Sequence, residues 1–336
     1  RGRSTQPEWV QQLTESYAQL MRQQIEMVES APQFLKTLER LGRKALDDLA
    51  HPSSSRTIPP KTSINGAIGR ERSFGTLTLP LDEVKGLGKA VGAKINDVVM
   101  TLVGGTLRRY LERLGELPDD PLIAGVPASL RKPGDYQMNN QVIMMLSSLG
   151  TQTADPLERL KIVSESMVDA KERLDMVKDT LHLEYSFYGA PLFMKGMTKF
   201  LSDTKAADRL PPTMNAVVSN VPGSRIPMYL LGHEMEAYFP VSIPTNGCGL
   251  NITVQSYLNN LDVGIVSAKT AVPDSYVIAD LLEEEFVAFR EAVHAVVAAS
   301  KTDEEPAPAP KAAAGKAAKP ATKRAPRKRA PARKAN

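Results

Sequence analysis

Two polar pairs are the residues whose types and positions could support chemistry. Asn96-Asp97 precedes a long apolar segment, and Ser219-Asn220 precedes a Pro-Gly dipeptide. The first pair is typical of a helix start, where Asn96 would cap backbone N–H groups and Asp97 would lie at the positive end of the helix dipole. The second pair ends an expected strand and presents a hydroxyl and an amide, groups that can stabilise a developing oxyanion. For both pairs a structural role and a role in a site remain compatible.

The other reactive side chains are isolated in the sequence. Cys248 lies in a turn, Asn246-Gly247-Cys248-Gly249, and is either a nucleophile or a small packed hydrophobe, because a reactive thiol needs a nearby base. The four histidines are scattered, so no Cys/His metal site is predicted. The GxSxG, Walker A, HExxH and strand-linked GxGxxG motifs are absent, which leaves no standard hydrolase, nucleotide-triphosphatase or dinucleotide signature.

Apolar periodicity predicts the elements that must position these residues. Helices are expected over 9–27, 35–46, 82–91, 96–114, 155–174 and 274–293. Strands are expected over 73–79, 122–126, 141–146, 215–219, 237–243, 250–255 and 261–266. Because helices and strands mix without strict β-α-β alternation, the sequence predicts an α+β fold with a mixed sheet and flanking helices.

Local signals add detail to these elements. Gly104 and Gly105 lie inside an expected helix, which indicates that a neighbouring backbone packs very closely there. Asp155-Pro156 is a typical helix start. Asn259-Asn260 predicts a hairpin between two strands, because Asn tolerates positive φ. The aromatic and Met residues of 185–201 are expected either to form a core helix or to line an apolar tunnel.

Composition separates an acidic body from a basic tail. Residues 306–336 contain ten of the 42 Lys and Arg and none of the 38 Asp and Glu, so residues 1–305 carry 32 basic against 38 acidic groups. The hydrophobic fraction of 42% excludes a wholly disordered chain. No apolar run reaches the roughly 18 residues that a membrane-spanning helix needs. One Cys excludes an internal disulfide.

Several stretches, in this order, resemble the wax ester synthase/diacylglycerol acyltransferase family. They cover most of residues 55–295: PKTSINGAIGRER from Pro60, INDVVMTLVGGTLRRYL from Ile95, GVPASLR from Gly125, DPLERL from Asp155, SNVPGS from Ser219, LNITVQSY from Leu250 and AVPD from Ala271. The resemblance implies a fold like that of the CoA-dependent acyltransferases, with two αβ lobes enclosing a tunnel. It also implies acyl transfer from acyl-CoA, as co-substrate and without a further cofactor, to diacylglycerol or a long-chain alcohol.

The resemblance implies a general-base histidine in an HHxxxDG motif, which this sequence lacks. The chain is therefore expected to be mainly the C-terminal lobe, either a piece of a longer enzyme or a truncated homologue without activity, and inactive alone. The missing N-terminal lobe would be its partner. Asn96 and Asp97 match the family's ND motif in a supporting role, and Ser219 and Asn220 match a turn near the tunnel that could polarise the thioester carbonyl. Arg131 would either bind substrate or pair with an acid to fix the lobes.

These considerations divide the chain into four expected parts. Residues 1–50 form a helical segment from the end of the N-terminal lobe, 51–63 a crossing linker, 64–300 the acyltransferase-like lobe and 301–336 a disordered Lys/Ala/Pro-rich tail. The tail is expected to bind an anionic membrane or lipid-droplet surface, which predicts a cytoplasmic, peripherally membrane-associated protein. The alternative is a non-catalytic module whose tail binds lipid or nucleic acid.

Overall fold

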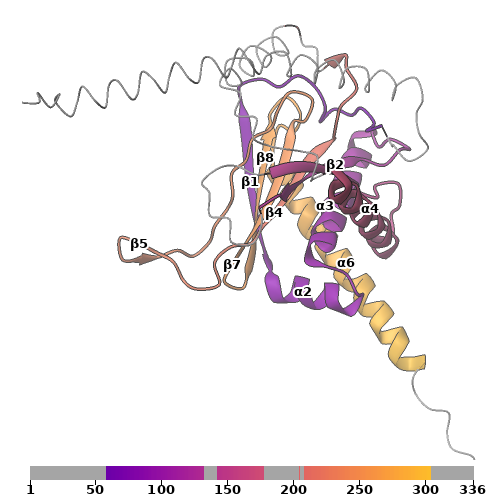
Figure 1. Ribbon diagram of the computed structural model, residues 1–336, viewed down its shortest axis with the longest axis vertical. Helices are drawn as coiled ribbons and strands as arrows, with labels where there is room; N and C mark the ends of the chain where they lie inside the picture. The colour runs from indigo at the N-terminus through magenta and orange to yellow at the C-terminus, as the bar shows by residue number, and fades with distance from the viewer. Residues whose placement is uncertain (1–57, 132–141, 178–203, 205–207, 304–336) are drawn as a thin grey trace, which may run out of the picture. The chain divides into compact units, whose positions relative to one another are not determined.

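A mixed six-stranded sheet is the centre of the fold. The computed structural model describes residues 58–131, 142–177, 204 and 208–303 (Figure 1). The strand order is β1-β8-β7-β4-β2-β3. The strands are β1 (Arg72–Pro80), β2 (Ile123–Ser129), β3 (Val142–Ser148), β4 (Ala216–Val221), β7 (Leu250–Tyr257) and β8 (Asn260–Ala268). The pairs β2–β4 and β4–β7 are parallel and the other pairs are antiparallel, so the expected α+β mixed sheet is confirmed.

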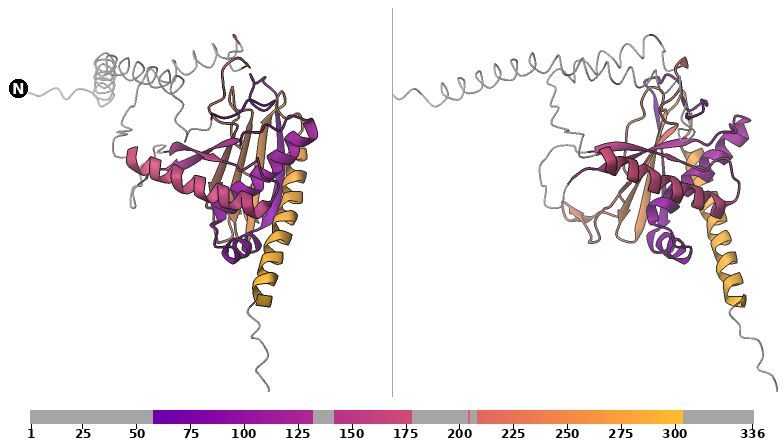
Figure 2. Two further views of the ribbon diagram at one scale, coloured as in Figure 1. Left: turned by 90° about the vertical axis from the view of Figure 1, so that its right-hand side faces the viewer. Right: turned by 45° about the vertical axis from the view of Figure 1, so that its right-hand side comes forward.

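Helices cover one face of this sheet. They are α2 (Leu81–Ala90), α3 (Ile95–Leu114), α4 (Pro156–Val177) and α6 (Tyr276–Asp303) (Figure 2). The core between helices and sheet is apolar, and the alternate residues Leu250, Ile252 and Val254 of β7 contribute to it. Leu281, Phe286, Phe289 and Val293 of α6 are buried as expected, whereas Val277 is 37% exposed. In the first turn of α6 the core position is taken by Ile278, which is 0% exposed, one residue after the predicted one.

The glycine pair of α3 lies where its neighbours approach most closely. A Cβ atom on Gly104 would lie 2.0 Å from the carbonyl oxygen of Leu149, and one on Gly105 would lie 2.1 Å from the carboxyl carbon of Glu285. Real Cβ atoms do not make such contacts, so only glycine fits at either position. The close backbone that the sequence predicted is confirmed at Gly104, whereas the close neighbour of Gly105 is the Glu285 side chain.

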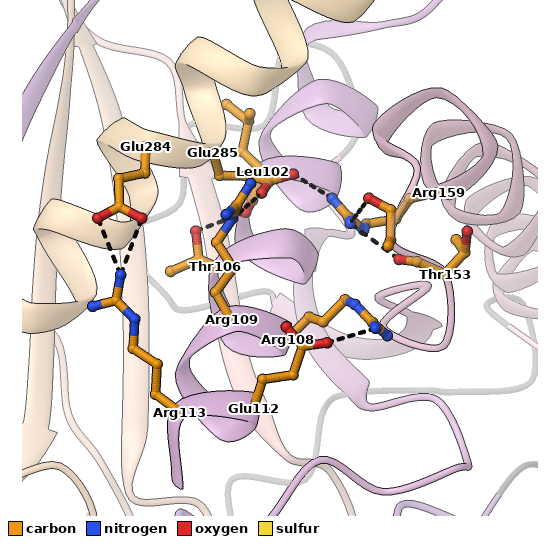
Figure 3. A network of polar contacts seen from close by, with 11 residues as sticks. Leu102, Thr106, Arg108, Arg109, Glu112, Arg113, Thr153, Arg159, Glu284 and Glu285 are labelled. Carbon is orange, nitrogen blue, oxygen red and sulfur yellow. Dashed lines mark hydrogen bonds and ion pairs between the residues drawn. The ribbon is translucent and has the colours of Figure 1, made fainter. Parts of the chain in front are cut away.

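A buried ion-pair network joins α3, α4 and α6 beside these glycines. Glu285 of α6 lies between Arg159 of α4 and Arg109 of α3 (Figure 3). Arg159 and Glu285 are 1% and 2% exposed, and Arg109 Nε donates to Glu285 Oε2 at 2.7 Å. Arg159 also donates to the carbonyl oxygens of Thr153 and Ala154 at 3.0 Å each. The network therefore ties α6 to both α3 and α4 through one carboxylate.

The hairpin between β7 and β8 differs in detail from the expectation. The two strands pair from Tyr257 opposite Asn260, so the two turn residues are Leu258 and Asn259. The positive φ angle of 51° belongs to Leu258 rather than to an asparagine. The backbone N–H of Leu258 donates to the carbonyl of Ser224 at 2.9 Å, and this tertiary contact favours the turn in place of local residue preference.

The strand expected over 237–243 is wrong. The segment is irregular and crosses the face of the sheet opposite the helices, where the carbonyl of Pro240 approaches Gly264 and Tyr238 N–H donates to Asp262 at 2.8 Å. Pro240 and Pro244 cannot donate to a strand ladder, which explains the difference. A short hairpin that the sequence did not predict precedes this segment, formed by β5 (Tyr229–Leu230) and β6 (His233–Glu234).

The remaining strands and helices expected within the described residues are confirmed with end shifts of at most three residues, except that α6 continues to Asp303, ten residues beyond its expected end. Asp155 caps α4 through bonds of 2.8 Å from the N–H groups of Leu157 and Glu158. The expected helices over 9–27 and 35–46, the Met-rich segment 185–201 and the basic tail 306–336 lie outside the described residues. None of the described helices combines the length and the apolar character that crossing a bilayer requires.

Candidate functional site

The carboxyl ends of the parallel strands β2, β4 and β7 meet at one edge of the sheet, where ligands commonly bind in αβ proteins. A pocket of about 500 Å³ lies at this edge. Its walls come from the start of α2, the start of α3, the end of β4 and the β7–β8 turn. The lining residues are Leu81, Asp82, Lys85, Ile95, Asn220, Pro222, Arg225, Ser256, Leu258, Asn259 and Leu261.

The start of α3 brings the Asn96-Asp97 pair next to this pocket. The helix begins at Ile95, which lines the pocket, and Lys94 has the extended backbone of the capping position. Asn96 is therefore already helical, and the expectation that it caps the helix is wrong. Asp97 Oδ2 instead accepts from the N–H of Lys94 at 3.4 Å, in the third helical position that capping boxes use. The cap thus depends on Asp97 and leaves the Asn96 side chain outside it.

The end of β4 places Ser219 and Asn220 on opposite faces of the sheet, because successive strand residues alternate. Asn220 shares the helix-covered face with buried Val218 and lines the pocket. Ser219 is on the other face and does not belong to the pocket lining. Because they lie on opposite faces, the Ser219 hydroxyl and the Asn220 amide cannot act on the same atom of a ligand. Of the two, Asn220 is the one that lines the pocket.

The turn after β4 is attached to the end of β7. A Cβ atom on Gly223 would lie 1.8 Å from the carbonyl oxygen of Ser256, and Gly223 N–H donates to Ser256 Oγ at 3.0 Å. The glycine of the Pro-Gly pair is thus required by a close backbone approach. This attachment fixes Asn220 and Pro222 against the β7–β8 turn, so the pocket wall is built from segments about 35 residues apart in sequence.

Helix α2 is attached to the same turn. The N–H of Leu81 donates to the carbonyl of Asn259 at 2.9 Å. In the amide orientation that satisfies its hydrogen bonds, the Asn259 side chain donates to the two Asp82 oxygens at 2.7 and 3.0 Å. Lys85 Nζ lies 3.7 Å from Asp82 Oδ1, and both side chains are well exposed. The Asp82 carboxylate is therefore satisfied mainly by Asn259.

The pocket can bind and orient a ligand, but it lacks an obvious base. Of the two described histidines, His233 is in β6 and His294 in α6, and neither lines the pocket. Among the described residues no three His, Cys, Asp or Glu side chains are grouped to hold a metal ion. The groups that line it are amides, a hydroxyl, two cations, the Asp82 carboxylate that Asn259 already bonds, and apolar side chains.

Two other candidates lie away from the pocket lining. Arg131 is exposed and follows β2 at the same sheet edge, with its N–H donating to Ser129 Oγ at 3.3 Å. Cys248 is 6% exposed, and burial raises the pKa of its thiol to about 11. A thiol with that pKa is protonated at neutral pH, so Cys248 behaves as the packed small side chain of the two alternatives.

Comparison with known proteins adds the decisive observation. The model of the wax ester synthase/diacylglycerol acyltransferase catalytic domain matches residues 2–99, and the model of the family's C-terminal domain matches residues 138–290. The chain belongs to the wax ester synthase/diacylglycerol acyltransferase family. The catalytic-domain match extends through β1 and α2 to the start of α3, and so includes one wall of the pocket.

Individual relatives support this membership. A putative diacylglycerol O-acyltransferase of Mycobacterium tuberculosis is 40% identical over 215 residues, which are 64% of this chain and 43% of the relative. The O-acyltransferase WSD of Acinetobacter baylyi is 36% identical over 232 residues, 68% of this chain and 49% of that protein. The chain spans about half the length of these curated relatives.

A solved structure shares the fold. The wax ester synthase/diacylglycerol acyltransferase of Marinobacter aquaeolei VT8 aligns with a TM-score of 0.56 and 27% identity, covering 70% of this chain and 53% of that one. The fold expected from the resemblance, an acyltransferase-like lobe, is therefore confirmed.

Sequence reasoning missed Lys85, Arg225 and Asn259 as pocket residues. Each is a common surface residue type in an unremarkable local setting, and Lys85 and Arg225 are 140 positions apart. They line one pocket only because α2 and the turn after β4 are both bonded to the β7–β8 turn.

Proposed function

We propose that this chain is the C-terminal part of an acyl-CoA-dependent O-acyltransferase that forms triacylglycerol or wax esters. The observation that supports it is the pocket at the carboxyl edge, where the start of α3 and Asn220 come together. In this role Asn220 orients the thioester carbonyl, because an amide N–H₂ can donate to an oxygen that becomes negative during attack. The base that deprotonates the acceptor hydroxyl comes from outside the described residues.

The proposal includes a second lobe, which completes the site. The β5–β6 hairpin stands away from the sheet (Figure 1). The hairpin and the segment that leads into it are apolar and exposed: Tyr229 is 63%, Leu230 75% and Leu231 93% exposed in the hairpin, and Ile226 before it is 71% exposed. Contiguous exposed apolar side chains mark interaction surfaces. We propose that an N-terminal lobe, corresponding to the other half of the relatives' length, packs on this hairpin.

Reconstitution tests the proposed function. The chain is mixed with, or fused to, the N-terminal half of a family member, and release of CoA from acyl-CoA is followed with diacylglycerol or a long-chain alcohol as acceptor. Turnover is expected only when both parts are present. Turnover by this chain alone would show that the base lies within it and would overturn the mechanism. Replacing Leu231 by Asp should prevent association while leaving the fold intact, since that side chain is solvent-exposed.

Asn96 offers a test that separates site from scaffold. Because Asn96 is helical and is not the cap, Asn96→Ala should leave stability unchanged or slightly raise it, since Ala has the higher helix propensity by roughly 0.6 kcal/mol. A fall in turnover of the reconstituted enzyme without a lower melting temperature supports a supporting role in the site. Unchanged turnover leaves Asn96 without a function in catalysis.

The basic tail is proposed as the contact with an anionic lipid surface. A segment with ten cations and no acid is attracted to such a surface by roughly 1 kcal/mol per nearby cation. Removing residues 306–336 should abolish binding to vesicles containing anionic lipid. Unchanged vesicle binding would refute the idea, and tail-dependent, salt-sensitive binding to DNA would favour nucleic acid instead.

A further inference from the structure

The lining of the pocket carries an excess of positive charge. Lys85 and Arg225 line it against the single carboxylate of Asp82. Asn259 already donates to both oxygens of Asp82, and Lys85 Nζ is 3.7 Å away from the nearer one. Arg225 is exposed and forms no ion pair with any residue that the structure describes. Both cations are therefore available to a ligand.

Both cations are carried by segments with anchored backbones. Arg225 follows Ser224, whose carbonyl accepts from Leu258 N–H at 2.9 Å and whose hydroxyl donates to the carbonyl of Ile226 at 2.7 Å. Lys85 lies one turn into α2, whose first residue is bonded to the β7–β8 turn through Asn259. The two cations are thus carried by backbone segments that are both bonded to the β7–β8 turn.

Five of the other lining residues are apolar. They are Leu81, Ile95, Pro222, Leu258 and Leu261. A pocket lined by two cations and by apolar side chains suits a ligand that has phosphate groups and a less polar arm. A neutral lipid alone would give neither cation an anionic partner.

We infer that this pocket is the donor side of the site, where Lys85 and Arg225 bind the phosphate groups of acyl-CoA. The inference rests on the proposed function and adds a choice between its substrates. Diacylglycerol and a long-chain alcohol are uncharged, so of the substrates proposed only acyl-CoA provides anions for these side chains. The apolar lining residues contact the pantetheine arm.

Binding to the 336-residue chain tests this directly. Calorimetry measures the affinity for CoA and for pantetheine, which has no phosphate, in the wild type and in Arg225→Ala, Lys85→Ala and the double variant. Each single change is expected to weaken CoA binding roughly three- to tenfold, as for exposed charge-assisted contacts, and to leave pantetheine binding unchanged. Raising the salt concentration should weaken CoA binding alone. Lys161→Ala, an exposed cation of α4 outside the pocket, is the matched control.

Three results would overturn the inference. They are no measurable CoA binding, equal affinity in the wild type and the double variant, or an equal loss in Lys161→Ala. Vesicles containing phosphatidylglycerol form a further arm: if Arg225→Ala lowers vesicle binding but not CoA binding, the anion is a lipid headgroup and the inference fails. Arg225→Gln, with an unchanged melting temperature, guards against an effect of misfolding.

The proposed function and the phosphate site can fail independently of each other. Turnover in the reconstituted enzyme with an unchanged KM for acyl-CoA in Arg225→Ala would keep the acyltransferase and remove the phosphate site. CoA binding that depends on Arg225, without turnover in the reconstituted enzyme, would keep the phosphate site and remove the acyltransferase.

Discussion

Neutralising Glu285 should cost more stability than any other single charge change in the helical layer. The substitution Glu285→Gln keeps the shape of the side chain and removes the anion between Arg159 and Arg109. Arg109 is 40% exposed and can turn to solvent, but Arg159 is 1% exposed and cannot. The variant therefore leaves a buried guanidinium without a counter-charge.

The expected loss follows from burial. Removing one partner of a buried ion pair costs about 3–5 kcal/mol. For a domain of this size, 1 kcal/mol shifts the melting temperature by about 2–4 °C, so the midpoint should fall by about 6–20 °C. Thermal and urea unfolding followed by circular dichroism measure both quantities.

The adjacent residue provides the control. Glu284 pairs with Arg113 at 3.1 Å, but these side chains are 50% and 55% exposed, so Glu284→Gln should cost less than about 1 kcal/mol. Adding Arg159→Met to Glu285→Gln should recover part of the loss, because no buried charge then remains. The reasoning is refuted if Glu285→Gln and Glu284→Gln unfold at the same temperature, or if the double variant is the least stable.

Two further sites give predictions with their own controls. Gly105→Ala should destabilise the fold by several kcal/mol, because the added methyl group would overlap Glu285. Gly86→Ala is the control, since Gly86 of α2 has open space around it and alanine there should stabilise the fold by up to roughly 1 kcal/mol. Equal effects of the two changes in urea unfolding would contradict the packing. Cys248 should resist thiol reagents at pH 8 unless the protein is unfolded, since burial raises the pKa of its thiol to about 11. In the unfolded chain the thiol loses its proton at pH ~8.5. The stability advantage of the wild type over Cys248→Ala should therefore be largest below that pH and fall as the pH rises toward 11. A stability difference independent of pH would count against the raised pKa.

The secondary structure was predictable wherever apolar periodicity and a local signal agreed. The long helix that ends at Gly115, which has a φ angle of 69°, is an example. The glycines within that helix also indicated close packing correctly. In these cases the burial of an element and its local preferences favour the same structure, so a single sequence contains the information.

Features decided by tertiary contacts were not predictable. Leu258 adopts positive φ because its N–H is bonded to Ser224, and no property of leucine indicates this. Alternation predicted a strand at 237–243, but the segment crosses the sheet instead of pairing with it. The pocket could not be predicted because its walls come from α2, α3, the turn after β4 and the β7–β8 turn, which are far apart in the sequence. Asn220 was found from its motif, whereas Lys85 and Arg225 are recognisable only in three dimensions.

The pairing of β1 with β8 has a consequence for how the protein can be divided. Arg72 to Pro80 pair with Ala268 to Asn260 along nine positions, although the two family models assign these strands to different domains. A cut after residue 99 would interrupt α3 within its second turn and expose the whole hydrogen-bonding edge of β8. The natural unit of folding in this part of the molecule therefore includes β1 and α2, and two fragments divided at the boundary of the models should each be insoluble alone and recover a native sheet only when produced together.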